Sequence, residues 1–406
     1  MKSKIFLLVI VSALCILIFY CCSKTCYQRN NCETLQADAI TKQWIVKFYD
    51  STEIADIQAA MEKLRNTYHA KVIDSCGCDP RLKLIEVTSL TPNDSVPPAD
   101  DNIHPQGIMG QNYVIFSDSS VAANDTGNLN TASEGSGIII AVIDGGINKT
   151  DRELANKFWV NPQPNDDCLP NALNGYDFVK KRGSVVGEII PHGTDVSKII
   201  VKNVCDNVNI QLMDLRVFDS SGNGTLFHGL CALSFAIKHG AKIVNMSWGY
   251  YKTEMGRSEE IFTDYIRVAR DSCMTLVASA GNDTVNTDYC LHFPSGFYAG
   301  SYKLGNVISV AALGKDENKL ADYSNYGEKT VGIAAKGTYD DIDQIPIYGT
   351  SYSAPVVTAA AANLYAKNDT ICATEIVNSL KENTSSIKSC HPIDKGGLKN
   401  TATQCQ

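Results

Sequence analysis

Three residues of this chain carry side chains that together can activate a serine nucleophile. Asp144 follows the apolar run 137–143 and precedes two glycines, so its carboxylate is expected at the end of a rigid strand. His192 opens the segment HGTDVSKII, which has helical spacing, and Ser351 lies in GTSYSAP at the start of a small-residue helix. Serine is a weak nucleophile at neutral pH unless a histidine removes its proton and a carboxylate orients that histidine. The three residues therefore predict acyl transfer through an ester on Ser351.

The elements that must position these residues alternate between apolar strands and helices. Continuous apolar runs are typical of strands buried on both faces, and their alternation with helices predicts a doubly wound, mostly parallel α/β sheet with helices on both faces. Ligands of such sheets bind at the carboxyl ends of the strands, where Asp144 is expected. The predicted strands are 137–143, 209–218, 241–248 and 274–280, and the predicted helices are 227–240, 259–272 and 351–366.

A smaller unit precedes this alternation. Strands are predicted over 44–49, 70–73 and 82–87, with a helix that starts at Asp50 and carries Glu53 in the capping position. This pattern predicts a small α+β domain with one helix on a sheet. From residue 91 to residue 105 the chain is rich in Pro, Asp and Asn and loses its periodicity, which is typical of an exposed linker.

The N-terminus has the layout of a secretory signal, because the start MKSK is followed by the apolar stretch Ile5–Tyr20. The rest of the chain is therefore predicted to be exported. Cys21 and Cys22 lie where a bacterial lipoprotein carries its lipidated cysteine. A lipoprotein signal, a cleaved signal peptide and an uncleaved membrane anchor all fit this stretch.

Composition indicates which partners are excluded and whether the cysteines form disulfides. The net charge is -8 and no long basic run occurs, so nucleic acid is excluded as a partner. Fifteen cysteines in an exported chain favour disulfides over a metal or redox site. After Cys22, four cysteines precede residue 80 and eight lie between Cys168 and Cys405, so each region can close its own bridges. Cys231 and Cys273 lie in apolar runs and fit buried free thiols equally well.

Four motifs occur in the order Asp, His, Ser along the chain: AVIDGGI, HGTDV, the pair SWG and ASAGN, and GTSYSAP. On these motifs the chain from about residue 115 to its end resembles the subtilisin-like serine proteases, the subtilase family, for which this order is known. The resemblance implies a serine endopeptidase that hydrolyses protein or peptide substrates, with Asp144, His192 and Ser351 as its triad. It implies no required cofactor. The segment VSKIIVKNVCDNVNIQLM is too short for the loop that builds a strong calcium site in many relatives, so calcium is not supported.

The same resemblance assigns further site residues. Asn282 matches the side chain that donates to the oxyanion beside the N–H of Ser351. His292 matches the base of the first specificity pocket, where it would reduce the depth or favour acidic side chains. A packed histidine beside Cys290 is the alternative. The other residues assigned to substrate binding, by addition of an extended peptide as a β-strand, are Ser247, Trp248, Gly249, Gly222, Gly224, Ala280 and Gly281.

The small N-terminal domain resembles the inhibitory propeptide of this family, with a permanent accessory domain as the alternative. The resemblance thus implies a zymogen whose own propeptide is a partner. The predicted organisation is a signal or anchor at 1–22, a linker at 23–43, a propeptide-like domain at 44–90, a linker with a candidate maturation site at 91–113, and a subtilisin-like peptidase domain at 114–406.

The surroundings of His192 depart from the family pattern. Pro191, Asp195 and Lys198 replace residues that are usually glycine, histidine and glycine, and Tyr352 stands where a methionine often follows the nucleophile. Two other functions fit the motifs. One is a dedicated maturation protease for a single secreted peptide, and the other is a noncatalytic binding protein on the same scaffold.

Overall fold

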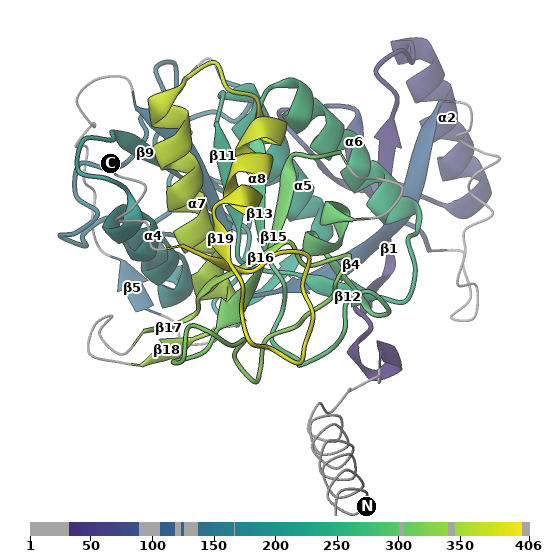
Figure 1. Ribbon diagram of the computed structural model, residues 1–406. Helices are drawn as coiled ribbons and strands as arrows, with labels where there is room; N and C mark the ends of the chain where they lie inside the picture. Colours follow the sequence, from purple (N-terminus) through teal and green to yellow (C-terminus); the bar gives the residue numbers. More distant parts are fainter. Residues whose placement is uncertain are drawn as a thin grey trace, which may run out of the picture.

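The computed structural model describes residues 32–88, 106–117, 123–125, 137–165, 167–299, 304–339 and 346–399. Within these residues a small N-terminal domain lies against a larger α/β domain (Figure 1). The apolar stretch Ile5–Tyr20 and most of the predicted second linker lie outside them. No helix of the described residues has both the length and the apolar character needed to cross a membrane.

A nine-stranded sheet forms the centre of the large domain, in the order β19-β20-β16-β15-β13-β11-β6-β9-β7. Its pairs are parallel except β19 with β20, so the predicted mostly parallel α/β sheet is confirmed. The strands are β6 (Ile138–Asp144), β7 (Gly175–Asp177), β9 (Ile210–Arg216), β11 (Ile243–Met246), β13 (Thr275–Ser279), β15 (Val307–Leu313), β16 (Ile333–Lys336), β19 (Thr384–Ser385) and β20 (Gly397–Leu398).

Helices pack on the sheet in two groups. The helices α4 (Pro191–Asn203) and α8 (Ala373–Glu382) both contact α7 (Thr350–Lys367), while α5 (Leu226–Lys238) packs against α6 (Arg257–Asp271). Helix α7 lies mainly against β11, β13, β15 and β16, and is buried from Thr350 to Asn363. Its run of alanines allows this close approach, because small side chains keep the helix axis near the sheet.

Strand β6 lies at the switch point of the sheet. The chain passes from β6 through α4 to β9 on one side, and then through α5 to β11 on the other side. Open α/β sheets bind ligands in the crevice that this reversal leaves at the carboxyl ends of the strands. Asp144, the last residue of β6, therefore lies at the expected place for a site.

The N-terminal domain is an antiparallel sheet with one helix. The strands β4, β1, β3 and β2 lie in that order, and β4 also pairs with β10 (Asn223–Thr225) of the large domain. The elements are β1 (Ala39–Phe48), α2 (Ile54–Tyr68), β2 (Lys71–Ser75), β3 (Leu82–Glu86) and β4 (Gly107–Phe116). The helix begins after Glu53, which is its N-cap, and not at Asp50 as predicted.

Both faces of this small sheet are buried. Trp44 and Ile85 pack with Leu64 of α2, whereas their neighbours Ile45 and Leu84 join the core of the large domain. Successive side chains of a strand point to opposite faces, so the alternation assigns one face to the helix and the other to the large domain. The two domains thus share a continuous apolar core.

Strand β4 corrects two predicted boundaries. The sequence pattern assigns residues 107–113 to a linker and residue 114 to the start of the peptidase domain, yet Gly107–Phe116 is one strand of the N-terminal sheet. The polar pair Gln111 and Asn112 hides the strand pattern. Asn112 is fully buried because its side-chain oxygen accepts from the N–H of Phe227 at the start of α5, at 3.1 Å.

Short elements complete the described fold. They are η1 (Cys32–Leu35), β5 (Ala123–Asp125), β8 (Gly187–Ile189), β12 (Tyr250–Lys252), β14 (Leu291–Phe293), η2 (Ser295–Tyr298), β17 (Thr338–Tyr339) and β18 (Ile347–Tyr348).

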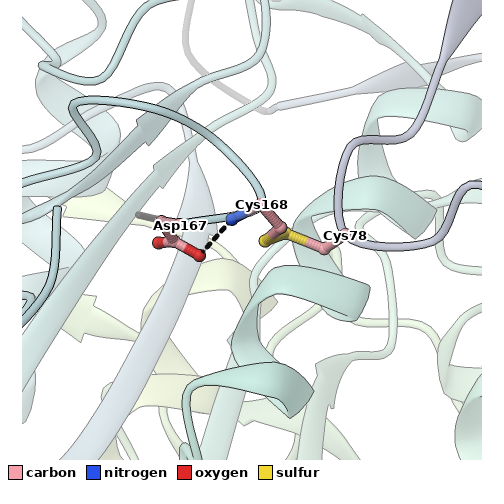
Figure 2. Close-up of side chains that lie close together, drawn as sticks. All are labelled: Cys78, Asp167 and Cys168. Atoms are coloured by element: carbon pink, nitrogen blue, oxygen red, sulfur yellow. Dashed lines mark hydrogen bonds between the residues drawn. A yellow bond between two sulfur atoms is a disulfide. The ribbon is translucent and has the colours of Figure 1, made fainter. Parts of the chain in front are cut away.

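Two disulfides join the N-terminal region to the large domain. Cys32 is bonded to Cys290 across 258 residues, and Cys78 to Cys168 across 90 residues (Figure 2). The expectation that each region closes its own bridges is therefore wrong for these pairs. A disulfide forms between cysteines whose Cα atoms lie close together in the fold. The even number of cysteines in each region does not show which of them lie close together.

Cys231 and Cys273, for which a disulfide and a free thiol were equally possible, are both free thiols. Cys231 is buried, and a hydrogen bond with Cys76 adds to the burial that raises the pKa of its thiol well above the usual value. Cys273 is only half-buried and its sulfur lies 2.9 Å from that of Cys372. Cys78, Asp167 and Cys168 are the one group of metal-ligand spacing among the described residues, and the bond between its sulfurs leaves no thiolates for a metal.

A buried ion pair stabilises the carboxyl side of the sheet. Lys149 Nζ lies 2.6 Å from Asp214 Oδ2 of β9, and the two side chains are 5% and 1% exposed. Lys149 also donates to the carbonyl oxygen of Val185 at 3.0 Å. Burial raises the pKa of Asp214, and the positive charge of Lys149 opposes that rise.

Replacement of Lys149 by methionine is expected to lower the free energy of unfolding by about 3–5 kcal/mol, because the carboxylate of Asp214 stays buried without its counter-charge. Urea unfolding monitored by circular dichroism measures this change. Lys319→Met is the matched control, since its 62% exposed side chain lies 4.0 Å from Asp316 and its loss is expected to cost less than about 0.5 kcal/mol. Equal unfolding midpoints for the two variants would contradict the assigned role of Lys149.

Candidate active site

Asp144 presents a fixed carboxylate to His192. It is fully buried at the end of β6, and its Oδ1 accepts the N–H of Gly145 at 2.7 Å. His192 Nδ1 lies 2.9 and 3.0 Å from the two carboxylate oxygens. Because an ionised carboxylate only accepts hydrogen bonds, the ring proton belongs on Nδ1, which leaves Nε2 as the basic nitrogen.

The start of α4 brings the imidazole to this carboxylate. Pro191 occupies the first turn of α4, where its missing N–H costs no hydrogen bond, so this departure from the family pattern fits the helix. A Cβ on Gly193 would lie 2.5 Å from the carbonyl oxygen of Gly146, so glycine allows α4 to approach β6. Lys198, another departure, is buried and pairs with Asp151 at 2.8 Å. The contact between Asp144 and His192 is compatible with both changes.

Ser351 lies in the first turn of α7, directly before Tyr352, the residue that contacts the imidazole. Its hydroxyl donates to the carbonyl oxygen of Ser247 at 3.1 Å, and its own carbonyl oxygen accepts from the hydroxyl of Ser247 at 2.7 Å. The following residue, Tyr352, packs its ring on His192 with centroids 5.3 Å apart. The structure thus gathers Asp144, His192 and Ser351 at one edge of the sheet, with the positive end of the α7 dipole at the serine.

Asn282 is oriented by the first residue of α7. Its side-chain oxygen accepts the N–H of Thr350 at 2.8 Å, which fixes the amide so that Nδ2 points the other way as a donor. Gly281 precedes it with a φ of 97°, and a Cβ there would lie 2.3 Å from Asn325 Nδ2. Ala280 was predicted to bind substrate, but its side chain packs in a core cluster with Leu313.

Two backbone edges flank the serine, and β4 lies between them. On one edge, Gly224 and its neighbours in β10 pair antiparallel with Val114–Phe116, and Ser117 N–H donates to the carbonyl oxygen of Gly222 at 3.0 Å. On the other edge, Phe116 N–H donates to the carbonyl oxygen of Gly249 at 3.4 Å. The edges predicted to bind a peptide are therefore occupied by the chain itself. Sequence reasoning missed this strand, although the apolar letters YVIF beside the linker were its signal.

His292 lies in the wall of a cavity of about 320 Å³ beside the Gly249 edge. Its Nδ1 is 2.8 Å from the hydroxyl of Ser295, and burial lowers the pKa of the ring to about 3, so the ring is neutral at neutral pH. A Cβ on Gly249 would lie 2.2 Å from the imidazole, which therefore packs directly on that backbone. The cavity is lined by Thr34–Asp38, Phe116, Trp248–Tyr251, Ser279, Gly281–Asp283 and His292.

Comparison with known proteins agrees with this geometry, since the model of the subtilase family matches residues 135–402. The chain belongs to the subtilase family of serine endopeptidases. The chain is 28% identical over 271 residues to the cell wall-associated protease of Bacillus subtilis, covering 64% of this chain but only 27% of that relative. It is also 28% identical over 244 residues to thermitase of Thermoactinomyces vulgaris, covering 57% of this chain and 76% of thermitase.

Among solved structures, the epidermin leader peptide processing serine protease (EpiP) of Staphylococcus aureus is similar in fold. The TM-score is 0.57 at 17% sequence identity, and the match covers 89% of this chain and 97% of that one. The part of this chain that the match covers is longer than residues 135–402, which the family model matches. The likeness in fold therefore extends to the N-terminal domain.

Proposed function

We propose that the chain is an exported serine endopeptidase that works through an acyl-enzyme on Ser351. The observation that carries the proposal is the buried contact between Asp144 and His192, at 2.9 Å, beside the first turn of α7, which contains Ser351. In this mechanism His192 Nε2 takes the proton of Ser351 as the hydroxyl attacks a peptide carbonyl. Asn282 Nδ2 and the N–H of Ser351 stabilise the oxyanion, and His192 then protonates the leaving amine. Water hydrolyses the ester, while Asp144 stays ionised throughout.

A fluorophosphonate probe tests this function without knowledge of the substrate. We expect the wild-type protein to be labelled at Ser351 and Ser351→Ala to remain unlabelled. Ser353→Ala is the matched control, because Ser353 lies two residues further along α7 and is equally buried. Equal labelling, or no labelling, of wild type and Ser351→Ala would contradict the proposal and favour the noncatalytic scaffold.

The zymogen form is supported by the position of the N-terminal domain. Its strand β4 fills the space between β10 and Gly249, where an extended substrate would bind. The N-terminal domain then acts as an inhibitory propeptide. The bridges Cys32–Cys290 and Cys78–Cys168 would hold it on the enzyme after a single cut in the linker, so release requires a second event such as reduction.

Export is proposed from the signal-like N-terminus, and the bridges fit an oxidising compartment. Cell fractionation, with intact mass and N-terminal sequencing of the mature protein, tests this. Recovery from outside the cytoplasm is expected. The mass separates a lipidated cysteine at position 21 or 22 from a cleaved signal and from an uncleaved anchor. Recovery of the full chain in the cytoplasm would contradict export.

A narrower function is favoured by the covered cleft. Residues Thr34–Asp38, which follow the bridge Cys32–Cys290, line the cavity that contains His292 and would limit access for large substrates. A dedicated maturation protease would suit such a site, and the similar fold of EpiP, by its name a leader peptide processing protease, supports this role. Digestion of unrelated casein and albumin by the processed enzyme would count against this narrower role.

Replacement of Asn282 by alanine is expected to slow peptide-bond cleavage by roughly 100- to 1000-fold, because one of two oxyanion donors is lost. Conversion of freshly refolded full-length chain to shorter fragments, followed on reducing gels, measures the rate. Asn318→Ala is the control, since Asn318 lies in an exposed turn with Asp316. A rate equal to that of the control would remove Asn282 from the mechanism.

A further inference from the structure

The cysteines that the described fold leaves as thiols are not scattered. Six of the ten described cysteines are in disulfides, and the other four are thiols. These four lie in two contacting pairs, Cys76 with Cys231 and Cys273 with Cys372. A cysteine that acts only as a small apolar side chain has no need of a second sulfur beside it. Two such contacts among four thiols therefore indicate chemistry between the sulfurs.

The first pair joins the N-terminal domain to the large domain. Cys76 lies in the turn CGC between β2 and β3, and Cys231 lies in α5. Both are 3% exposed, and a hydrogen bond joins their thiols. They also line one cavity of about 80 Å³ at the interface between the domains. Because this space is not filled by side chains, the two sulfurs can approach each other without displacing packed neighbours.

The neighbouring bridge shows how closely this turn packs on the large domain. Cys78, the second cysteine of the turn, is bonded to Cys168 (Figure 2). A Cβ on the intervening Gly77 would lie 2.5 Å from the carbonyl oxygen of Cys168, so glycine is the residue that fits between the two cysteines. The motif CGC thus places one sulfur on Cys168 and the other against Cys231, with the turn between them held on the large domain.

The second pair lies within the large domain. Cys273 follows α6, Cys372 is the N-cap of α8, and their sulfurs are 2.9 Å apart. Tyr365 Oη donates to the carbonyl oxygen of Cys273 at 2.7 Å, and the N–H of Cys372 donates to Glu375 Oε2 at 3.0 Å. Both backbones are therefore held in place. The sulfurs of a disulfide are about 2.0 Å apart, so closure needs a movement of less than about 1 Å.

We propose that these thiols are the reduced form of two further disulfides, Cys76–Cys231 and Cys273–Cys372, and that the first makes the CGC turn a double clasp between the domains. The oxidant is the disulfide of a small thiol compound, such as oxidised glutathione. One cysteine thiolate attacks this disulfide and releases one reduced thiol. The second cysteine then displaces the other from the mixed disulfide. Both electrons and both protons of the pair end on the two released thiols.

The two pairs differ in accessibility. Cys372 is exposed, whereas Cys76 and Cys231 are buried, and burial raises the pKa of the Cys231 thiol. The thiolate is the attacking species, so the buried pair is oxidised while the interface is still open, before folding is complete. The exposed pair can be oxidised and reduced in the folded protein. We therefore expect the double clasp to be permanent and the bridge Cys273–Cys372 to be reversible.

Peptide mapping of the unreduced protein tests both bonds. Full-length protein is refolded with a mixture of reduced and oxidised glutathione, denatured, and treated with N-ethylmaleimide before digestion. The digest is expected to contain peptides linked through Cys76–Cys231 and through Cys273–Cys372, with no maleimide on these four residues. Maleimide on both members of a pair would overturn that bridge. This readout requires no substitution, so it does not depend on the folding of a variant.

A variant separates the two cysteines of the CGC turn, which share one tryptic peptide. Cys231→Ser is expected to carry one maleimide on Cys76 and to keep the link Cys78–Cys168. Ser234→Ala is the matched control, because Ser234 is buried three residues further along α5, and this variant should keep both links. Maleimide on Cys78 in place of Cys76 in the Cys231→Ser protein would overturn the assigned pairing.

Reduction of the folded, oxidised protein by dithiothreitol tests the difference in accessibility. Cys273–Cys372 is expected to be reduced at least about 10-fold faster than Cys76–Cys231, because an attacking thiolate must reach a sulfur to displace it. The two rates are read from the maleimide that each pair takes up with time. Equal rates under native conditions would overturn the permanence of the double clasp.

Discussion

A His192→Ala variant is expected to cleave peptide bonds more slowly by a factor on the order of 10⁶, the scale on which a subtilisin loses activity when either its histidine or its serine is removed. The reason is the geometry at the end of β6. Nδ1 is held by the carboxylate of Asp144 at 2.9 Å, so Nε2 is the nitrogen of this ring that can take the proton of Ser351. Alanine removes that base and leaves the serine as an ordinary hydroxyl.

The measurement is the conversion of refolded full-length chain on reducing gels, combined with the rate of fluorophosphonate labelling. Both are expected to fall together, since each requires the activated hydroxyl of Ser351. His391→Ala controls for the loss of an imidazole, because His391 lies on the ring of Tyr326 and touches no member of the triad. Labelling of His192→Ala at the wild-type rate would exclude His192 as the base.

The triad could be predicted from the sequence because each member lies in a short motif at an element boundary. Asp144 ends a strand, and His192 and Ser351 each lie in the first turn of a helix, so local patterns were enough to place them. Asn282 came from the family resemblance, and its orientation depends on a hydrogen bond to Thr350, which is 68 residues away. The existence of the site was thus encoded locally, whereas its fine geometry was not.

The contents of the cleft could not be predicted in this way. Strand β4 reads as part of a linker, since Gly107, Gly110 and the pair Gln111 and Asn112 interrupt its apolar pattern. The reason for these residue types lies in contacts that β4 makes with the large domain. A Cβ on Gly110 would lie 2.6 Å from the backbone nitrogen of Ser258, and the hydroxyl of Ser258 donates to the carbonyl oxygen of Gln111. The disulfide Cys78–Cys168 is likewise a property of this interface.

Asp144→Asn is expected to reduce the rate of cleavage by about 10⁴-fold at neutral pH while the fold stays intact. The side chain keeps its size and can still accept the N–H of Gly145, which lies at 2.7 Å from Oδ1. Its amide NH₂ can then face the imidazole and donate to Nδ1. That hydrogen bond stabilises the tautomer with the proton on Nε2, which cannot take a proton from Ser351.

The same gel assay measures this loss, with thermal unfolding as a check on the fold. Asp316→Asn is the control, because Asp316 lies in an exposed turn with Asn318 and its change should leave the rate unaltered. A wild-type rate for Asp144→Asn would mean that the carboxylate does not set the tautomer of His192.

A double variant separates orientation from other effects of Asp144. If Asp144 acts only through His192, then Asp144→Asn combined with His192→Ala should be no slower than His192→Ala alone, because the carboxylate has no imidazole left to orient. Independent contributions would instead multiply, and the double variant would lose about a further 10⁴-fold. Both oxygens of Asp144 lie within 3.0 Å of Nδ1, and the structure gives this fully buried carboxylate no other side-chain hydrogen bond among the described residues. The expected result is therefore complete non-additivity, and a multiplicative loss would assign Asp144 a second role in the transition state.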